Sequence, residues 1–552
     1  MNLIDKQLKE EIVKAFKTLF DFELNASDFE LQPTRKEFEG THTLVVFPYL
    51  RQTKKGPEQS GEAIGEYLKE HSPIVSAYNV VKGFLNLSIA ESAWVNVLQA
   101  IAAETSFGQY EPTGEKVMVE FSSPNTNKPL HLGHLRNNFL GDSVSKILAA
   151  RGHEVKKVNL VNDRGIHICK SMLAYEKFGD GETPESTGIK GDKLIGNYYV
   201  KFDQEYKKEI EQLMADGKSE DEAKKQAPLM LEAQAMLKKW EEGDDATVAL
   251  WKKMNGWVYD GFDITYETMG ISFDTVYHES ETYLLGKDIV EEGLEKGVFF
   301  KKDDNSVWAD LTADKLDEKL VLRGDGTSVY ITQDIGTCDL KHNDFPFNKS
   351  VYVVGNEQDY HFKVLFSIMD KLGRDYADGL YHLSYGMVDL PSGKMKSREG
   401  TVVDADDLMQ EMFDTARKQT EELGKIEGMT DEQADELFRT LGLGALKYFL
   451  LKVDPKKRML FNPQESIEFQ GNTGPFIQYT HARISAILRR ANSLEIDQNF
   501  DASKVTSLHP RALDLIHKLT EYPKIIDLAA GDYSPALVAG YAYELAKTYN
   551  GF

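Results

Sequence analysis

The first twenty residues alternate apolar and charged positions with the period of an α-helix. Their apolar members recur at every fourth position: Ile4, Leu8, Ile12, Phe16 and Phe20. Charged residues fill the gaps, which indicates an amphipathic helix and not the continuous apolar core of a secretory signal. Strand-like runs at 43–48 and 84–89 enclose a helical pattern at 61–70. Residues 1–108 are therefore predicted to form a small α+β domain.

A different pattern begins near residue 116. An almost continuous apolar run at 117–121 is typical of a buried parallel strand. A helical pattern covers 133–151, and a second strand-like run covers 155–161. Strand, helix and strand at this spacing predict a βαβ unit.

The same alternation returns at 350–354 and 380–388, each followed by a helical pattern. Together these segments predict a doubly wound, Rossmann-like parallel sheet within residues 109–442, so the fold class is α/β. A charged, largely helical stretch at about 172–325 is predicted to be one insertion between the halves of this sheet. Residues 443–552 are mainly helical and are expected to form an α-helical C-terminal domain.

Composition limits the class of protein. A chain of 552 residues is long enough for three or four domains. Hydrophobic residues make up 41% and charged residues 28%, and no apolar run approaches the roughly 18 residues that a membrane span needs. The two cysteines, Cys169 and Cys338, have no paired spacing, which argues against a disulfide framework or a cysteine-ligated zinc site. We expect a cytoplasmic protein without a membrane partner.

The net charge of −24 is unevenly distributed. From residue 443 onward thirteen Lys and Arg residues face eleven Asp and Glu residues, so this part carries +2 and the rest −26. The C-terminal part is therefore the expected nucleic-acid face.

Residues 122–136 carry the most informative motif. An apolar strand leads through a loop into His131-Leu-Gly-His134, at the predicted start of a helix. Helix N-termini attract anions, both histidines can donate to phosphate oxygens, Gly133 allows close approach, and Lys128 adds a positive charge. Alternatively, two histidines three residues apart could cap the helix or bind a metal.

A second candidate segment lies at 392–403, after the last predicted strand of the sheet. It contains Lys394, Met395, Lys396 and Ser397. A basic loop of this kind suits the stabilisation of displaced pyrophosphate, although such a turn taken alone is usually a solvated loop.

These two segments resemble the HIGH and KMSKS motifs of class I aminoacyl-tRNA synthetases. The resemblance implies that His131, His134, Lys128, Lys394 and Lys396 are catalytic. It also implies that ATP contacts Gly133, Met395 and Ser397. Ser397 stands where the second motif normally has its second lysine. Many arginyl-tRNA synthetases lack that lysine and have one just before the HIGH motif, as Lys128 is here, although Lys396 could also substitute in part.

Recognition of arginine requires carboxylates, because a guanidinium is permanently charged and offers a planar fork of donors. Three segments, at 120–125, 330–334 and 354–361, resemble the amino-acid pocket of arginyl-tRNA synthetases. The resemblance implies that Asp334 pairs with the guanidinium and Tyr330 assists. It further implies that Asn125 and Gln358 hold the α-amino and carboxylate end of arginine and that Glu120 lines the pocket. Without the resemblance, Tyr330 and Asp334 would be interpreted as packing at a helix start.

Residues 159–167 also resemble a family segment, and Asp163 is equally compatible with a structural turn or with substrate contact. Residues 469–484 resemble the start of the DALR anticodon-binding domain. There Arg483, Arg489 and Arg490 could bind tRNA phosphates, and Tyr479 is expected in the core. The N-terminal domain would reach the D-arm of the tRNA. Family members usually continue for some tens of residues beyond Phe552, which implies a truncated or differently ended helical domain.

The resemblance implies an arginine–tRNA ligase that acts as a monomer on L-arginine, ATP and tRNA(Arg). Mg²⁺ would enter with ATP, and no tightly bound metal or organic cofactor is expected. Another class I synthetase, or a non-catalytic tRNA-binding relative, are the alternatives.

Overall fold

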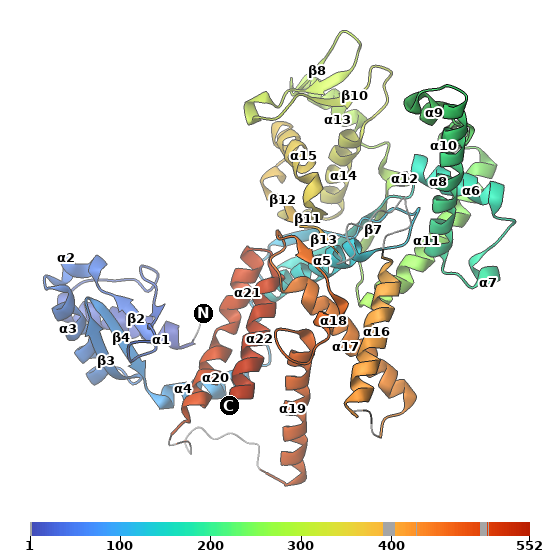
Figure 1. Cartoon of the computed structure of the whole chain (residues 1–552). Helices are drawn as coiled ribbons and strands as arrows, with labels where there is room; N and C mark the ends of the chain where they lie inside the picture. The colour runs from blue at the N-terminus through green and yellow to red at the C-terminus, as the bar shows by residue number, and fades with distance from the viewer. Residues whose placement is uncertain (1–2, 390–402, 425, 427, 497–504, 506) are drawn as a thin grey trace. The chain divides into compact units, whose positions relative to one another are not determined.

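The computed structural model describes residues 3–389, 403–424, 426, 428–496, 505 and 507–552. The chain divides into two compact units (Figure 1). One comprises Met1–Tyr110, Phe476–Asp532 and Gly540–Phe552, and the other comprises Glu111–Pro475 and Tyr533–Ala539. No helix among the described residues is long and apolar enough to cross a membrane.

The N-terminal part of the first unit is an α+β domain, as predicted. Helix α1 (Leu3–Phe20) buries Ile4, Leu8, Ile12 and Phe16 completely. An antiparallel sheet has the strand order β1-β2-β4-β3. Its strands and the other helices are β1 (Gln32–Pro33), β2 (His42–Val45), η1 (Phe47–Tyr49), α2 (Leu50–Thr53), α3 (Pro57–His71), β3 (Val75–Val81), β4 (Phe84–Ile89) and α4 (Glu91–Ala103).

The C-terminal helices share a core with this domain. They are α19 (Gly474–Ser493), α20 (Pro510–Thr520), α21 (Tyr522–Gly531) and α22 (Pro535–Gly551). Ile516 of α20 is buried in the same apolar cluster as Phe16 and Trp94. Segments from opposite ends of the sequence therefore exclude water together.

The second unit is built on a five-stranded parallel sheet, which confirms the predicted fold class. Its order is β12-β11-β5-β6-β7, and every neighbouring pair is parallel. The strands are β5 (Lys116–Glu120), β6 (Glu154–Val161), β7 (Thr275–His278), β11 (Lys349–Gly355) and β12 (Leu380–Tyr385). Strand order runs outward in both directions from β5 and β11, so the switch point of the sheet lies between them. Ligands of such sheets bind at the carboxyl ends of the strands at this point.

Two insertions interrupt the sheet. The first, between β6 and β7, consists of α6 (Ile166–Phe178), α7 (Pro184–Thr187), α8 (Gly191–Ala215), α9 (Glu220–Gln226), α10 (Pro228–Glu241) and α11 (Asp245–Met269). The second, between β7 and β11, consists of α12 (Glu279–Thr282), α13 (Lys287–Glu295), β8 (Phe299–Lys301), β9 (Val307–Ala309), η2 (Thr312–Asp314), β10 (Lys319–Leu322) and α14 (Tyr330–Asp344).

Strand β7 corrects the prediction of one insertion at 172–325, because it lies inside that stretch and pairs with β6. It was missed because a four-residue edge strand has too few residues to show a period.

The remaining elements of the second unit follow β11. They are η3 (Asn356–Gln358), α15 (Asp359–Lys371), η4 (Ala377–Gly379), β13 (Val388–Asp389), α16 (Ala405–Glu422), α17 (Asp431–Leu451), β14 (Met459–Leu460) and α18 (Pro463–Ser466). Strands β13 and β14 pair in parallel. The expected domain limit at residue 443 falls inside α17.

Helix α5 (Leu132–Ala150) lies against the strand that precedes it because Gly141 has no side chain. A Cβ at Gly141 would lie 2.2 Å from Cγ of the buried Phe121. The close contact between Gly141 and Phe121 sets the position of α5, and therefore of its N-terminus, relative to β5.

We predict that Gly141→Ala lowers the free energy of unfolding by about 1–3 kcal/mol, because the added methyl overpacks the interface. Gly256→Ala is the control: Gly256 lies inside α11 with no atom within 4 Å of a Cβ. The control substitution should raise the free energy of unfolding by up to about 1 kcal/mol, since alanine has a higher helix propensity than glycine. Urea unfolding measures both, and equal effects would contradict the packing argument.

Candidate active site

The loop after β5 begins with two residues in left-handed conformation. Ser122 and Ser123 have φ angles of 77° and 46°. Their backbone N–H groups donate to Oδ1 of Asn137 at 2.6 Å and of Asn159 at 3.0 Å. Side chains from α5 and β6 therefore compensate for the strain and direct the loop toward the start of α5.

His131 and His134 hold the N-terminus of α5 through their Nδ1 atoms. Nδ1 of His131 accepts from the N–H of Gly133 at 3.1 Å, and Nδ1 of His134 accepts from the N–H of His131 at 3.1 Å. Burial, with the charge of Lys128, lowers the pKa of His131 to about 3, and burial also lowers that of His134 well below its usual value. Both rings are therefore neutral, and we assign the remaining proton to Nε2, where it can donate to a ligand.

The last residue of the KMSKS-like stretch and the residues after it pair with this turn. The N–H of Leu132 donates to the carbonyl of Val403 at 3.2 Å, and the N–H of Ala405 donates to that of Leu130 at 2.9 Å. His131 and Asp404 form the antiparallel bridge between them. Four predicted residues of that stretch lie outside the described residues: Lys394, Met395, Lys396 and Ser397. Its C-terminal flank is nevertheless placed beside both histidines.

The N-terminal flank is held by Arg136, which sequence reasoning missed. Its guanidinium is buried and donates to the carbonyls of Gly386 at 2.7 Å, Pro455 at 3.1 Å and Lys457 at 2.9 Å. Burial lowers the pKa of Arg136 to about 10. One feature of the sequence could have indicated its burial: Arg136 lies beside Leu132 and Leu135, on a helix face that is otherwise apolar.

A small pocket lies at the switch point, at the carboxyl end of β5. Its volume is about 50 Å³. Its lining includes Glu120, Asp334, Cys338, Lys341, Tyr352 and His361. Glu120 and Asp334, which come from separate predicted segments, therefore meet in one cavity.

Each carboxylate of this pocket already has a partner. Glu120 forms a buried ion pair with Lys341, whose ammonium lies 5.1 Å from the centre of the Tyr352 ring. Asp334 Oδ2 lies 2.7 Å from Nε2 of His361. Sequence analysis predicted neither partner.

The other predicted pocket residues stand around the same sheet edge. Tyr330, one helical turn before Asp334 on α14, has 77% of its surface exposed. Asn125 is half-buried and forms a parallel bridge with Asn162 after β5 and β6. Gln358 is exposed at the start of α15, which follows β11.

Glu279, at the start of α12, is a further acidic group that sequence reasoning missed. Burial raises the pKa of its carboxyl to about 7; Arg164 opposes this, while the charges of Asp163 and Asp334 add to it. A carboxyl group whose pKa lies near 7, beside another acidic side chain, is typical of a ligand-binding site. Its only sequence signal was its place after β7, a strand that was itself missed.

Asp163 has a structural role. Its carboxylate accepts from the backbone and hydroxyl of Ser280 at 2.8 and 2.7 Å and from Tyr259 at 2.8 Å. Its carbonyl accepts from Trp251 at 2.7 Å. The side chain is buried, so the geometry favours the structural turn over substrate contact.

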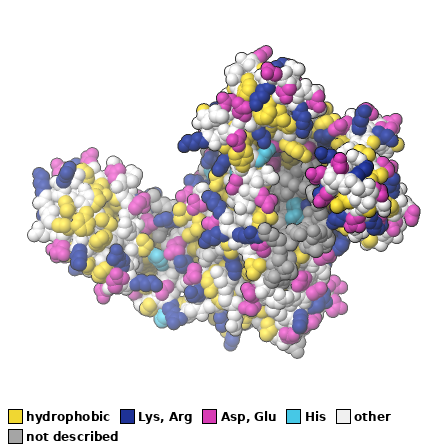
Figure 2. Space-filling model, turned by 45° about the horizontal axis from the view of Figure 1, so that its top comes forward, with side chains coloured by type: hydrophobic (Ala, Val, Ile, Leu, Met, Phe, Trp, Pro, Cys, Tyr) yellow, Lys and Arg dark blue, Asp and Glu magenta, His cyan; other side chains and the backbone are white. Residues whose placement is uncertain are grey.

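The candidate tRNA residues lie on α19. Arg489 and Arg490 are exposed, and Nη1 of Arg483 donates to Asn550 at 2.9 Å. Tyr479 was expected in the core, but 45% of its surface is exposed because its face of the helix is turned away from the packed side. Basic and acidic side chains are interspersed over the face of the molecule drawn in Figure 2. Among the described residues, no group of three or more His, Cys, Asp and Glu side chains is arranged to hold a metal ion.

Known proteins are similar to this chain over nearly its whole length. The family model "tRNA synthetases class I (R), catalytic domain" matches residues 96–462, and "DALR anticodon binding domain" matches residues 477–552. The arginine–tRNA ligase of Amoebophilus asiaticus (strain 5a2) is 59% identical over 548 residues, which cover 99% of this chain and 92% of that protein. That of Bacteroides fragilis (strain YCH46) is 56% identical over 551 residues, which cover 100% and 92%.

Two solved structures share the fold at low sequence identity. An arginyl-tRNA synthetase from Thermus thermophilus matches with a TM-score of 0.77 and 23% identity, over 100% of this chain and 91% of that one. One from Plasmodium falciparum matches with a TM-score of 0.72 and 18% identity, over 100% and 92%.

We predict that Lys341→Met lowers the free energy of unfolding by about 3–5 kcal/mol, because it leaves Glu120 buried without a counter-charge. The double variant Glu120→Leu/Lys341→Met removes the unpaired charge, so it should be more stable than Lys341→Met. Urea unfolding of the variants and the unchanged protein measures this difference. A double variant no more stable than Lys341→Met would show that packing, not charge, sets the cost.

Proposed function

The chain belongs to the class I arginyl-tRNA synthetase family, and from this premise we infer that it activates L-arginine with ATP and transfers the arginyl group to the 3′ end of tRNA(Arg). The carboxylate of arginine attacks the α-phosphorus of ATP, and pyrophosphate leaves. A ribose hydroxyl of the terminal tRNA nucleotide then attacks the arginyl-adenylate, and AMP leaves. No protein nucleophile is needed, so the residues of the chain bind, align and stabilise charge.

We assign the phosphates to the turn at the start of α5. The observation that supports this best is the antiparallel pairing of Leu130–Leu132 with Val403–Ala405. It places the flank of the KMSKS-like stretch beside two neutral histidines whose Nε2–H groups can donate. Lys128 would oppose the charge of the phosphates in the role of the lysine absent at Ser397. Lys394, Lys396, Met395 and Gly133 complete the proposed ATP site.

We assign the amino acid to the pocket at the switch point. Asp334 would take the guanidinium in place of its contact with His361, with Glu279 as a second acceptor and Tyr330 covering the opening. Asn125 and Gln358 would hold the α-amino and carboxylate end, and Glu120 would line the pocket. A guanidinium bound between carboxylates makes paired, charge-assisted hydrogen bonds that a neutral or shorter side chain cannot reproduce.

The remaining assignments follow the same division. Residues 1–108 would contact the D-arm, and the C-terminal helices with Arg483, Arg489 and Arg490 would contact the anticodon side of the tRNA. Mg²⁺ would enter bound to ATP, and no other cofactor is proposed. We propose a cytoplasmic monomer.

Arginine-dependent exchange of pyrophosphate into ATP tests the function. We expect exchange with arginine in the presence of tRNA(Arg), and none with other amino acids. Exchange with a different amino acid would indicate another class I synthetase, and tRNA binding without exchange would indicate a non-catalytic relative.

Two variants separate the two half-sites in this assay. Lys128→Ala should lower kcat by about 10²-fold or more, with little change in arginine affinity, because it removes charge stabilisation from the phosphates. Asp334→Asn should weaken arginine binding by about 30-fold or more and leave the KM for ATP unchanged, because it unpairs a buried guanidinium. If Lys128→Ala lowers kcat and arginine affinity equally, the lysine contacts arginine and not the phosphates.

Arginine binding should also depend on pH through Glu279. With a pKa of about 7, this carboxyl is mostly protonated at pH 6 and mostly ionised at pH 8. The guanidinium stays charged throughout, so arginine affinity should rise by up to about tenfold as the ionised fraction rises. Equilibrium dialysis with labelled arginine and tRNA measures it. In Glu279→Gln, arginine affinity should no longer change with pH. If it changes with pH as in the unchanged protein, Glu279 does not contact arginine.

A further inference from the structure

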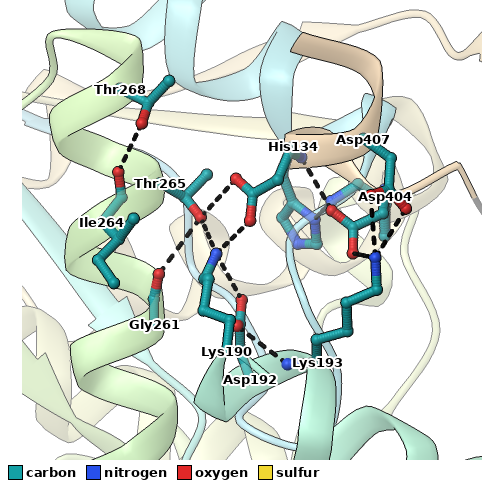
Figure 3. Close-up of polar contacts among 12 residues, drawn as sticks. His134, Lys190, Asp192, Lys193, Gly261, Ile264, Thr265, Thr268, Asp404 and Asp407 are labelled. Carbon is teal, nitrogen blue, oxygen red and sulfur yellow. Dashed lines mark hydrogen bonds and ion pairs between the residues drawn. The ribbon is translucent and has the colours of Figure 1, made fainter. Parts of the chain in front are cut away.

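The start of α16, directly after the KMSKS-like stretch, is bound to lysines of the inserted helix α8 (Figure 3). Lys193 Nζ lies 2.9 Å from both carboxylate oxygens of Asp407 and 3.8 Å from Oδ2 of Asp404. Lys190 forms an ion pair with Asp406. Asp404 is the N-cap of α16 and forms an antiparallel β-bridge with His131. The lysines are therefore connected, through Asp404, to the turn that is proposed to bind phosphate.

Lys190 is fixed from the opposite side. Its Nζ donates to Oγ1 of Thr265 on α11 at 2.5 Å and lies 3.2 Å from Oδ2 of the buried Asp192. Thr265 also donates to Asp406 at 2.9 Å. A Cβ at Gly261 would lie 2.6 Å from Oδ1 of Asp192, so α8 and α11 are in close contact here. Lys190, the N-cap of α8, is therefore held by contacts to α8, α11 and α16.

Helix α8 also touches the loop that carries Lys128. A Cβ at Gly196 would lie 2.8 Å from Cδ of Pro129 and 3.6 Å from Cα of Lys128. A cavity of about 240 Å³ remains between the three segments. Its lining includes Lys128, His131, Lys193, Tyr199, Asp404 and Asp407.

The two lysines offset part of the negative charge of this cluster. Asp192, Asp404, Asp406 and Asp407 supply four carboxyl groups, against which Lys190 and Lys193 supply two ammonium groups. Asp404 and Asp407 line the same cavity as Lys128 and His131, so salt screens their charge only weakly from an anion bound there. Removal of either lysine would leave uncompensated negative charge where the triphosphate is proposed to bind.

We propose that Lys190 and Lys193 are positioning residues for ATP in the activation step. They hold the start of α16 against the histidine turn, and they cancel carboxylate charge that would repel the triphosphate. The first insertion is thereby part of the activation site. This inference rests on the proposed function.

Pyrophosphate exchange with arginine and tRNA(Arg) tests the proposal. Lys193→Met should raise the KM for ATP by about 3–10-fold and leave the KM for arginine within about twofold, because ATP is an anion and arginine carries a net positive charge. Lys193→Arg should restore the KM. The double variant Lys193→Met/Asp407→Asn should also recover much of it, because the carboxylate that lost its partner is gone.

The matched control is Lys201→Met, on the same helix, where the lysine pairs with Glu205 at 2.7 Å. It should leave both KM values unchanged. Lys190→Met tests the more buried lysine and should change the KM for ATP in the same direction. Raising the salt concentration should reduce the effect of Lys193→Met, since the carboxylates would be screened. A fall in thermal stability without any of these ATP-specific changes would assign both lysines to folding alone.

The outcomes separate this proposal from the proposed function. If the unchanged protein shows no arginine-dependent exchange, the proposed function is wrong. If it does, and Lys193→Met leaves both KM values unchanged or raises both equally, only the positioning role is overturned.

Discussion

Two backbone hydrogen bonds between Leu130–Leu132 and Val403–Ala405 join parts of the chain that are far apart in sequence. Backbone pairing fixes direction and register, which side-chain contacts alone would leave adjustable. It sets the N-cap of α16 against the N-cap of α5, His131. His131, Lys128 and Asp404 thereby line one cavity. The proposed ATP chemistry depends on this alignment, because charge stabilisation is effective only when the donors are already in place.

The surrounding site is organised by buried charges that nearly all have partners. Glu120 is paired with Lys341, Arg136 is surrounded by carbonyl groups, and the carboxylate of Asp163 is saturated by Ser280 and Tyr259. A buried charge without such partners would shift its pKa or destabilise the fold. Asp334 and Glu279 differ, since Asp334 pairs with a histidine and the carboxyl of Glu279 has a pKa near neutrality. A permanently cationic ligand would satisfy both.

The inserted helices give this site part of its rigidity. Helices α8 and α11 approach each other closely at Gly191 and Gly261, and α8 contacts the Lys128 loop at Gly196. At each point a Cβ would collide with a neighbour, so the contacts leave little freedom to shift. The charged surface of the insertion suggested only a solvated addition to the sheet. Its buried end shows instead that the addition braces the two segments on which activation is proposed to depend.

Local patterns in the sequence determined a large part of this protein. The period of α1, the apolar runs of β5 and β6, and the two histidines at a helix start could be identified because each depends on residues adjacent in the chain. Strands β3 and β7 could not, since β3 does not alternate between buried and exposed positions and β7 is four residues long. Lys341, Arg136 and Glu279 were also not predicted, because their neighbours in the sequence do not show which distant groups they meet. Only the tertiary structure decided their roles, by burying each one beside a partner or a ligand site from a distant segment, where low polarity makes the pairing strong.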